Sequence, residues 1–333
     1  MAHSKHSESH ETESPPTPPA RWLPRLLHNL LMASLFLVVC FSILRFTARW
    51  SAWGELFSHF VIQYGLILLL GAAYCFATSA PRNALVLLCF SSLNLSLLLP
   101  FLPRTLPAPP QDVIPIASVN VLIKNRDYRR TLNFAESASP DILIVSEVDD
   151  EWLQALDALN YPYSKKFLAF DWLGLAIYSR FEILSSETFP ANSPDPYACA
   201  WTLKVKDREL VVIGAHPEPP RLPPNSERQR TLAAMTEFVA KYSKQKPTVL
   251  IGDLNVTPWS PYFENMKRGA ELSDARAGQG VLQTWPAPFP PLWIPIDHCL
   301  VSKEVTVHGF WTAESVGSDH FPIVCRVSLA KSP

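Results

Sequence analysis

Polar side chains follow apolar, strand-like runs at several places in the C-terminal two-thirds of the chain. Four of these runs are DILIVSE, TVLIGDLN, PIDHCLVS and GSDHFPIV. Strands that bury apolar side chains and then present carboxylates at one edge are suited to hold a hard cation for phosphate chemistry. The candidate residues at these ends, and at two further runs, are Asn120, Glu147, His216, Asp253, Asn255, Asp297, Asp319 and His320.

Composition divides the chain near residue 110. The 333 residues suffice for one or two domains, and 48% are hydrophobic while 18% are charged. Only seven Lys and Arg and four Asp and Glu precede residue 110, whereas 22 and 26 follow it, a net charge of about −4. The C-terminal part therefore has ordinary soluble composition, and its charge does not indicate a strongly basic, nucleic-acid-gripping surface.

The six cysteines show no spacing typical of a zinc site or a disulfide framework. They lie in apolar or strand-like runs, where a free thiol behaves as a small hydrophobic side chain. We expect buried thiols.

The composition of the N-terminal third predicts a polar tail followed by membrane helices. Residues 1–25 are rich in His, Ser, Glu and Pro and are expected to be disordered. Residues 26–102 contain three apolar stretches, at about 30–44, 56–78 and 84–102, each close to the ~20 residues that span a bilayer. Three buried helices of a soluble domain, or a signal peptide and two core helices, are the alternatives. The three stretches have no amphipathic face that could meet water, which favours membrane spans over these alternatives.

Three spans place the two ends of the chain on opposite sides of the membrane. Four positive side chains lie on the N-terminal side and three on the other. The positive-inside rule therefore favours, by a small margin, a cytoplasmic N-terminus and a C-terminal domain on the exported side of a multi-pass membrane protein.

A Pro-rich linker at residues 103–115 leads into a domain at 116–330. This domain alternates short β-branched runs with helical stretches, of which residues 226–244 are the longest, with Ser226 as the expected N-cap. Two sheets flanked by helices is the economical packing for this pattern.

The segments GDLN, IDHCLVS and SDHFPI, in this order and with Asn120 and Glu147 before them, resemble the deoxyribonuclease-I-like endonuclease/exonuclease/phosphatase superfamily. The resemblance covers about residues 116–329 and implies an α/β fold, a four-layer α/β/β/α sandwich, here preceded by a three-helix transmembrane region. Pro295 and His298 depart from the abasic-site nuclease pattern and look like a bacterial membrane-anchored group, which suggests the bacterial inner membrane.

The resemblance also implies a metal site. Glu147 is expected to be the main ligand of Mg²⁺, for which Mn²⁺ can substitute, with Asn120 and Asp319 completing the site. A solvent-exposed strand-end acid is the alternative for Glu147.

The implied catalytic roles follow the same resemblance. Asp253 orients or deprotonates the attacking water, and Asn255 donates to a phosphoryl oxygen, although an Asx turn explains the same pair. His320 contacts the scissile phosphate, and Asp297 accepts the other ring N–H of His320. His216 acts on the phosphate or leaving group, unless it is only a turn residue.

Two arginines, Arg180 and Arg221, are candidates for substrate binding, and a structural ion pair is the alternative for Arg180.

The predicted enzyme is a membrane-anchored, Mg²⁺-dependent hydrolase of phosphodiester bonds, an endonuclease or exonuclease. A phosphodiesterase or phosphatase acting on a phospholipid or inositol headgroup is the first alternative, and a non-catalytic membrane scaffold is the second. The apolar loop at residues 282–295 favours a lipid or small substrate unless it is an internal plug. The expected partners are the phosphodiester substrate and the lipid bilayer, and no protein partner is implied.

Overall fold

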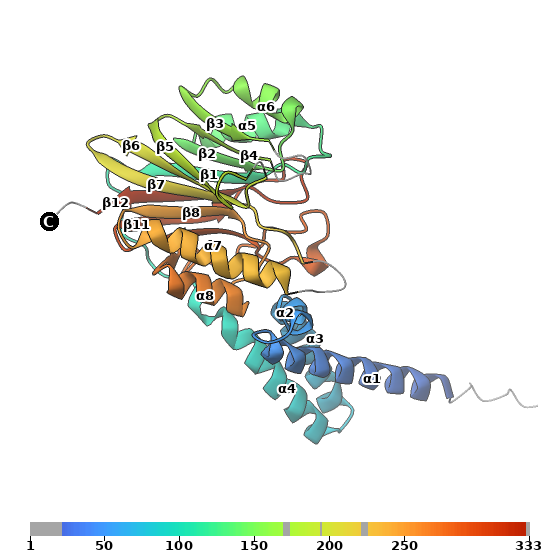
Figure 1. The fold of residues 1–333 in the computed structure, drawn as a ribbon. Coiled ribbons are helices and arrows are strands. Elements are labelled where there is room, and N and C mark those ends of the chain that lie inside the picture. Colours follow the sequence, from blue (N-terminus) through green and yellow to red (C-terminus); the bar gives the residue numbers. More distant parts are fainter. Residues whose placement is uncertain (1–21, 169–173, 194, 221–225, 331–333) are drawn as a thin grey trace, which may run out of the picture.

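The computed structural model describes residues 22–168, 174–193, 195–220 and 226–330. A group of N-terminal helices extends away from an α/β domain (Figure 1). The predicted disordered tail lies mostly outside the described residues, and the first helix begins at Trp22, before the predicted start at residue 26.

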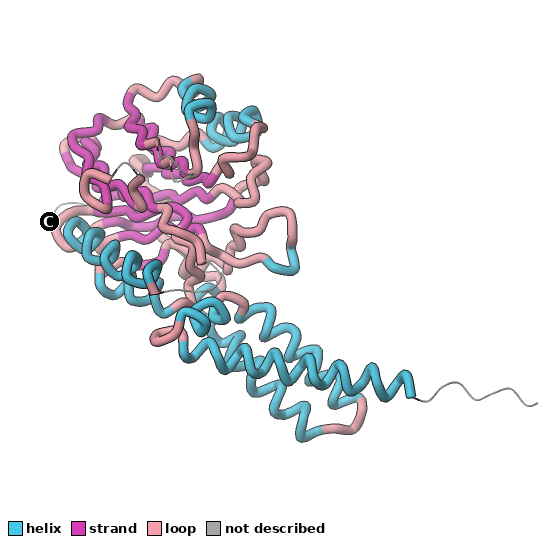
Figure 2. The backbone as a smooth tube through the Cα atoms, turned by 45° about the vertical axis from the view of Figure 1, so that its right-hand side comes forward, coloured by secondary structure: helices cyan, strands magenta, loops and turns pink. Residues whose placement is uncertain are grey.

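The N-terminal helices include two that are long and apolar enough to cross a membrane, Trp22–Thr47 and Pro81–Phe101. At a rise of ~1.5 Å per residue, the 23 residues of α1 exceed the ~30 Å hydrocarbon core. The helices run side by side away from the domain (Figure 2). Their bounds are α1 Trp22–Leu44, η1 Arg45–Thr47, α2 Ala52–Ser58, α3 Val61–Ala77, α4 Pro81–Leu95 and η2 Ser96–Phe101.

The prediction of one continuous helix over residues 56–78 is wrong near its start. The helix is interrupted between α2 and α3, and the axes of these two helices differ in direction by 64°. His59 lies at this break, and its side chain and carbonyl both contact the α/β domain. Long-range polar contacts therefore end α2 where the local apolar pattern continues.

Small residues let the helices pack closely. A Cβ at Gly71 would lie 2.5 Å from Leu35, and one at Gly65 would lie 2.5 Å from Leu95. On the outer surface Leu70, Leu85 and other large apolar side chains are exposed. Such a continuous apolar surface is typical of membrane association.

The first sheet has the strand order β11-β12-β1-β2-β4-β3. β1 and β2 are parallel, and β12 and β4 pair antiparallel on either side of them. The strand bounds are β1 Ile114–Asn120, β2 Ile142–Ser146, β3 Tyr163–Phe167, β4 Leu175–Ser179, β11 Val305–Thr312 and β12 Ile323–Leu329.

The second sheet has the order β5-β6-β7-β8-β10-β9. β7 and β8 are parallel, and β10 is antiparallel to β8 with Asp297 opposite Asp253. The strand bounds are β5 Glu182–Phe189, β6 Ala198–Val205, β7 Arg208–Ala215, β8 Thr248–Asp253, β9 Ser273–Asp274 and β10 Asp297–Val301.

The two sheets pack face to face and helices cover their outer faces, which confirms the predicted four-layer α/β/β/α sandwich (Figure 1). Trp201 and Ile144 belong to the core between the sheets. Phe134 and Trp152 pack α5 and α6 on the first sheet, while Met235 and Phe263 pack α7 and α8 on the second. The helix bounds are α5 Tyr128–Ala138, α6 Asp150–Asp157, α7 Glu227–Ser243, α8 Pro261–Gly269 and the short η3 Pro290–Leu292.

Buried polar contacts join α2 to the domain, and we call this contact the α2 junction. Arg228 Nη1 lies 3.0 Å from Glu55 Oε1, and His59 Nδ1 lies 3.1 Å from Thr257 Oγ1. The indole of Trp259 donates to the carbonyl of His59 at 3.0 Å. The helices are therefore fixed to the domain on the side of α7.

Candidate active site

The strand topology gathers the predicted catalytic and metal-binding residues at one edge of the sandwich, which we call the rim. Asn120 and Asp253 end β1 and β8, while Glu147 and His216 directly follow β2 and β7. Asp297 begins the antiparallel β10. Carboxyl ends of parallel strands and amino ends of their antiparallel neighbours share an edge, so these side chains meet.

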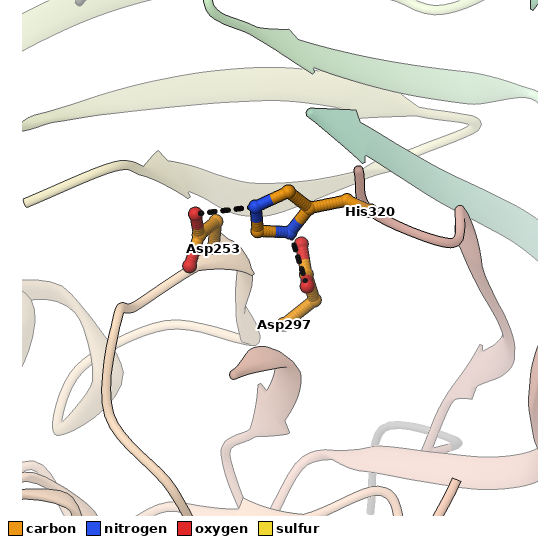
Figure 3. Close-up of side chains that lie close together, drawn as sticks. All are labelled: Asp253, Asp297 and His320. Atoms are coloured by element: carbon orange, nitrogen blue, oxygen red, sulfur yellow. Dashed lines mark hydrogen bonds and ion pairs between the residues drawn. The ribbon is translucent and has the colours of Figure 1, made fainter. Parts of the chain in front are cut away.

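His320 lies between two carboxylates (Figure 3). Its Nδ1–H donates to Asp297 Oδ2 at 2.9 Å, and its Nε2 is 3.6 Å from Asp253 Oδ2. Burial opposes the charge of the ring, but Asp297 and Asp253 outweigh it and raise the pKa of His320 to about 10. The imidazole is therefore a cation at neutral pH.

Asp253 is 1% exposed, and its surroundings favour the neutral form of its carboxyl group. Burial, reinforced by Asp297 and Glu147 and opposed by His320, raises the pKa of Asp253 to about 8. The Asn255 backbone N–H donates to Asp253 Oδ1 at 2.8 Å. This is the Asx turn considered as an alternative, and it leaves Asp253 Oδ2 directed at His320. A buried carboxylate with such a pKa is suited to accept a proton near neutral pH.

Glu147 lies in a left-handed backbone conformation, with φ of 58°. Non-glycine residues held in this region often lie at functional sites. The Asn120 amide donates to Glu147 Oε1 at 2.8 Å and to Asp253 Oδ2 at 3.2 Å, so it bridges the two sheets. Burial raises the pKa of Glu147, and the nearby charge of Asp319 adds to this effect.

His216 faces the same carboxylates. Its Nε2 is 3.5 Å from Glu147 Oε1 and 3.6 Å from Asp253 Oδ2. Burial and the neighbouring His320 cation lower the pKa of His216 to about 4, so this ring is neutral. Its Nδ1 is buried without a hydrogen-bond partner among the described residues. The two histidines therefore differ in charge.

Asn255 and Asp319 border the rim. Asn255 also has a left-handed conformation, with φ of 53°, and its amide donates to the Pro217 carbonyl. The indole N–H of Trp285 donates to Asp319 Oδ2 at 2.9 Å. Trp285 thus orients the carboxylate that neighbours Glu147.

The charges at the rim fit a divalent cation. Glu147, Asp253, Asp297 and Asp319 contribute four carboxyl groups, whereas His320 is the cation that interacts with them. Ligand atoms of Asp253, Asp297 and His320 lie within 4.8 Å of one another and form one group able to hold a metal ion. Glu147, Asn120 and Asp319 also carry oxygen atoms, the type of donor that Mg²⁺ prefers.

Of the two predicted substrate-binding arginines, the structure describes Arg180, which is not brought to the rim. Arg180 follows β4 at the end opposite to Glu147, because Ser179 pairs with Ile142 at the start of β2. It lies 3.5 Å from Asp141 and contacts Ser139, so the structural ion pair is what the structure shows. Arg221 lies outside the described residues.

Several supporting residues were missed by sequence reasoning. Buried Arg276 donates to the Asp297 carbonyl and contacts His298. Thr284 Oγ1 accepts from the Asp297 N–H. Their signal was weak because Arg276 and Thr284 lie in irregular segments, far in sequence from the strand that they support.

Comparison with known proteins identifies the family of this fold. Residues 117–320 match the sequence profile of the Endonuclease/Exonuclease/phosphatase family, which is more than half of the chain. The protein therefore belongs to this family and has its phosphoesterase fold. No functionally curated protein matches the chain in sequence.

Solved structures show the same fold at low sequence identity. The 3′ phosphatase NExo from Neisseria, bound to a product DNA hairpin, has 22% identity and a TM-score of 0.54, over 64% of this chain and 98% of its own. A family protein from Bacteroides vulgatus has 20% identity and a TM-score of 0.54, over 66% and 100%. The human Nocturnin catalytic domain with bound sulfate has 19% identity and a TM-score of 0.52, over 66% and 95%.

Proposed function

We propose that this protein is a membrane-anchored, divalent-metal-dependent hydrolase of phosphodiester bonds, with Mg²⁺ as the natural cation and Mn²⁺ as a substitute. The observation that carries the proposal is the buried Asp297–His320–Asp253 series beside Glu147 and Asn120. A non-catalytic scaffold is less favoured, since a scaffold has no need for this costly burial of like charges.

The proposed chemistry is a single displacement at phosphorus. Asp253 accepts a proton from the attacking water, the bond from phosphorus to the leaving oxygen breaks, and the leaving oxygen takes a proton from solvent. The His320 cation donates to a non-bridging phosphoryl oxygen. Asp297 holds the His320 ring and its charge, while His216 and Asn255 contact the remaining phosphoryl oxygens. A divalent cation held by Glu147, Asn120 and Asp319 would polarise the phosphoryl group.

Membrane anchoring is supported by the two apolar helices and the bent α2–α3 pair. We propose three spans in the bacterial inner membrane, a linker at residues 103–115 and a catalytic domain on the exported side. Since Neisseria NExo is described bound to DNA, nucleic acid is one candidate substrate.

The test uses the full-length protein in lipid nanodiscs with Mg²⁺ or Mn²⁺ and bis(4-nitrophenyl) phosphate. We expect hydrolysis, and His320→Ala should reduce its rate by about 10²–10³-fold. His308→Ala is the matched control, because His308 hydrogen-bonds Ser328 away from the rim. Hydrolysis that survives in His320→Ala, or no hydrolysis by the wild type, would refute the proposal.

A further inference from the structure

An apolar pocket of about 250 Å³ lies between α2 and the α/β domain. One wall is formed by Leu56 of α2 and Phe60 at the start of α3, and the other by Pro219, Trp285 and Ile294. No Lys, Arg, Asp or Glu is among the described residues that line it. Ligand pockets usually have volumes of ~300–1,000 Å³, so this smaller pocket can accommodate only part of a ligand. Its lining favours a part that is apolar.

The pocket adjoins the rim at two residues that contact both. Asn255 lines the pocket and follows Asp253 by two positions. Trp285 also lines it, while its indole N–H donates to Asp319 Oδ2 at 2.9 Å. A substrate with its phosphate at the rim can therefore extend an adjoining apolar group into the pocket.

The pocket also lies at the end of the apolar helices that faces the domain. Its α2 wall is at the bend between α2 and α3, and Gln63 of α3 donates to the Trp293 carbonyl at 3.0 Å. Near this end Trp50 is 83% exposed and Trp53 is 52% exposed. Exposed tryptophans at helix ends are typical of the membrane–water interface. With the helices spanning a membrane as proposed, the pocket lies near the level of the lipid headgroups.

The loop at residues 282–295 supports the same placement. Ile294 is buried against the pocket, whereas Phe289 is 52% exposed and Leu292 is 42% exposed. The loop is therefore only partly an internal plug. Its exposed apolar side chains adjoin Trp293, which is held to α3 by Gln63.

From these observations we infer that the pocket binds a hydrocarbon chain of a membrane lipid phosphodiester whose phosphate occupies the rim. The inference rests on the proposed function and names its substrate class. A nucleic acid instead requires cationic side chains along its backbone and aromatic faces for its bases. None of the described residues that line the pocket is a Lys or Arg, and the lining His59 is paired with Glu55 at 3.1 Å.

The test measures chain-length dependence with alkyl 4-nitrophenyl phosphates, from methyl to octyl, and the full-length protein in nanodiscs. Water attacks phosphorus, the bond to the nitrophenyl oxygen breaks, and 4-nitrophenolate and the alkyl phosphate are released. Each methylene that enters the pocket should raise kcat/KM by about fourfold, until the pocket is filled. We therefore expect the octyl-to-methyl ratio of kcat/KM to exceed about tenfold.

Three variants and one control assign that ratio to the pocket. Leu56→Gln makes the α2 wall polar, Leu56→Trp fills the space, and Ile294→Gln changes the opposite wall without altering α2. Each should lower the octyl-to-methyl ratio at least about fivefold. Leu184→Gln is the matched control, since Leu184 is exposed on β5, and its ratio should stay at the wild-type value.

The outcomes separate this inference from the proposed function. Hydrolysis that depends on His320 with an equal rate for all chain lengths, or a ratio unchanged in all three pocket variants, overturns the lipid inference alone. Efficient cleavage of plasmid DNA together with a flat alkyl series does the same and makes the protein a nuclease. If no ester is hydrolysed with Mg²⁺ or Mn²⁺, the proposed function fails and the inference fails with it.

Discussion

The rim and the α2 junction both bury charged side chains, but they balance the charges differently. At the junction the carboxylate of Glu55 lies 3.0 Å from Arg228 and 3.1 Å from His59. At the rim four carboxyl groups surround His320, and the pKa values of Asp253 and Glu147 are raised by burial. A buried cluster with compensated charge fits a structural role, whereas one with excess negative charge fits the binding of a cation.

The comparison predicts opposite effects of mutation in the two regions. Changes at the rim should reduce activity and relieve repulsion in the folded state, while changes at the junction should reduce stability. Strained or repulsive groups at functional sites commonly show this exchange between stability and activity.

Asp253→Asn should produce the largest effect. Loss of the proton acceptor should lower the rate of bis(4-nitrophenyl) phosphate hydrolysis by about 10²–10⁴-fold. Without added metal at pH 8.5 the thermal midpoint should rise, because the ionised carboxylate that the fold disfavours is gone. Asp207→Asn, in the exposed turn between β6 and β7, is the control. A variant with near wild-type activity would remove Asp253 from the mechanism.

Arg228→Met should destabilise the protein by about 3–5 kcal/mol, since it removes the permanently charged partner of the buried Glu55 carboxylate and leaves only His59 beside it. Unfolding of the full chain in detergent measures this difference. Arg230→Met, an exposed neighbour on α7, is the control, and the double change Glu55→Leu with Arg228→Met should restore most of the lost stability. A loss below about 1 kcal/mol for Arg228→Met would show that the junction pair acts like an exposed one.

The pH dependence of activity should be bell-shaped. Activity should rise as Asp253 loses its proton. The pKa of Asp253 is about 8 in the site without a cation, and a bound cation should lower it, so the acidic limb should lie at or below pH 8. Activity should fall as His320 loses its proton at a pKa of about 10. Because Asp297 helps to raise the pKa of His320, Asp297→Asn should move the alkaline limb to lower pH. An alkaline limb that stays in place would contradict the role of this pair.

Arg180→Met should have the smallest effect. Its half-exposed ion pair with Asp141 lies at the edge opposite to the rim, so the free energy of unfolding should change by no more than about 0.5 kcal/mol. Hydrolysis kinetics should be unchanged, and a marked rise in KM would restore Arg180 to substrate binding.

The sequence predicted the four-layer fold and the position of the rim because strand ends carry a local signal. Asp253 and Glu147 directly follow apolar runs, and parallel strands bring such ends to one edge. The same logic misplaced Arg180, since the antiparallel direction of β4 is decided by pairing with β2 and not by local residues.

The remaining features depend on contacts that are distant in sequence. Glu55 and Arg228 are 173 positions apart, and neither local pattern reveals the partner. The short helix α8 was also missed, although Ser260 caps it and Pro261 occupies its first turn, a recognised start signal. The break at His59 follows from its contacts with Thr257 and Trp259, which an apolar pattern cannot show.

The most direct test of the account is the stabilisation of the full-length protein by Mg²⁺. If the excess carboxylates at the rim bind the cation, the free energy of unfolding should rise by about 2.7 kcal/mol when Mg²⁺ is a hundredfold above its Kd. Glu147→Gln should lose most of this gain at the same Mg²⁺ concentration, while Glu182→Gln at the exposed start of β5 should keep it. An equal gain in wild type and Glu147→Gln, or no gain in the wild type, would contradict a cation site at the rim.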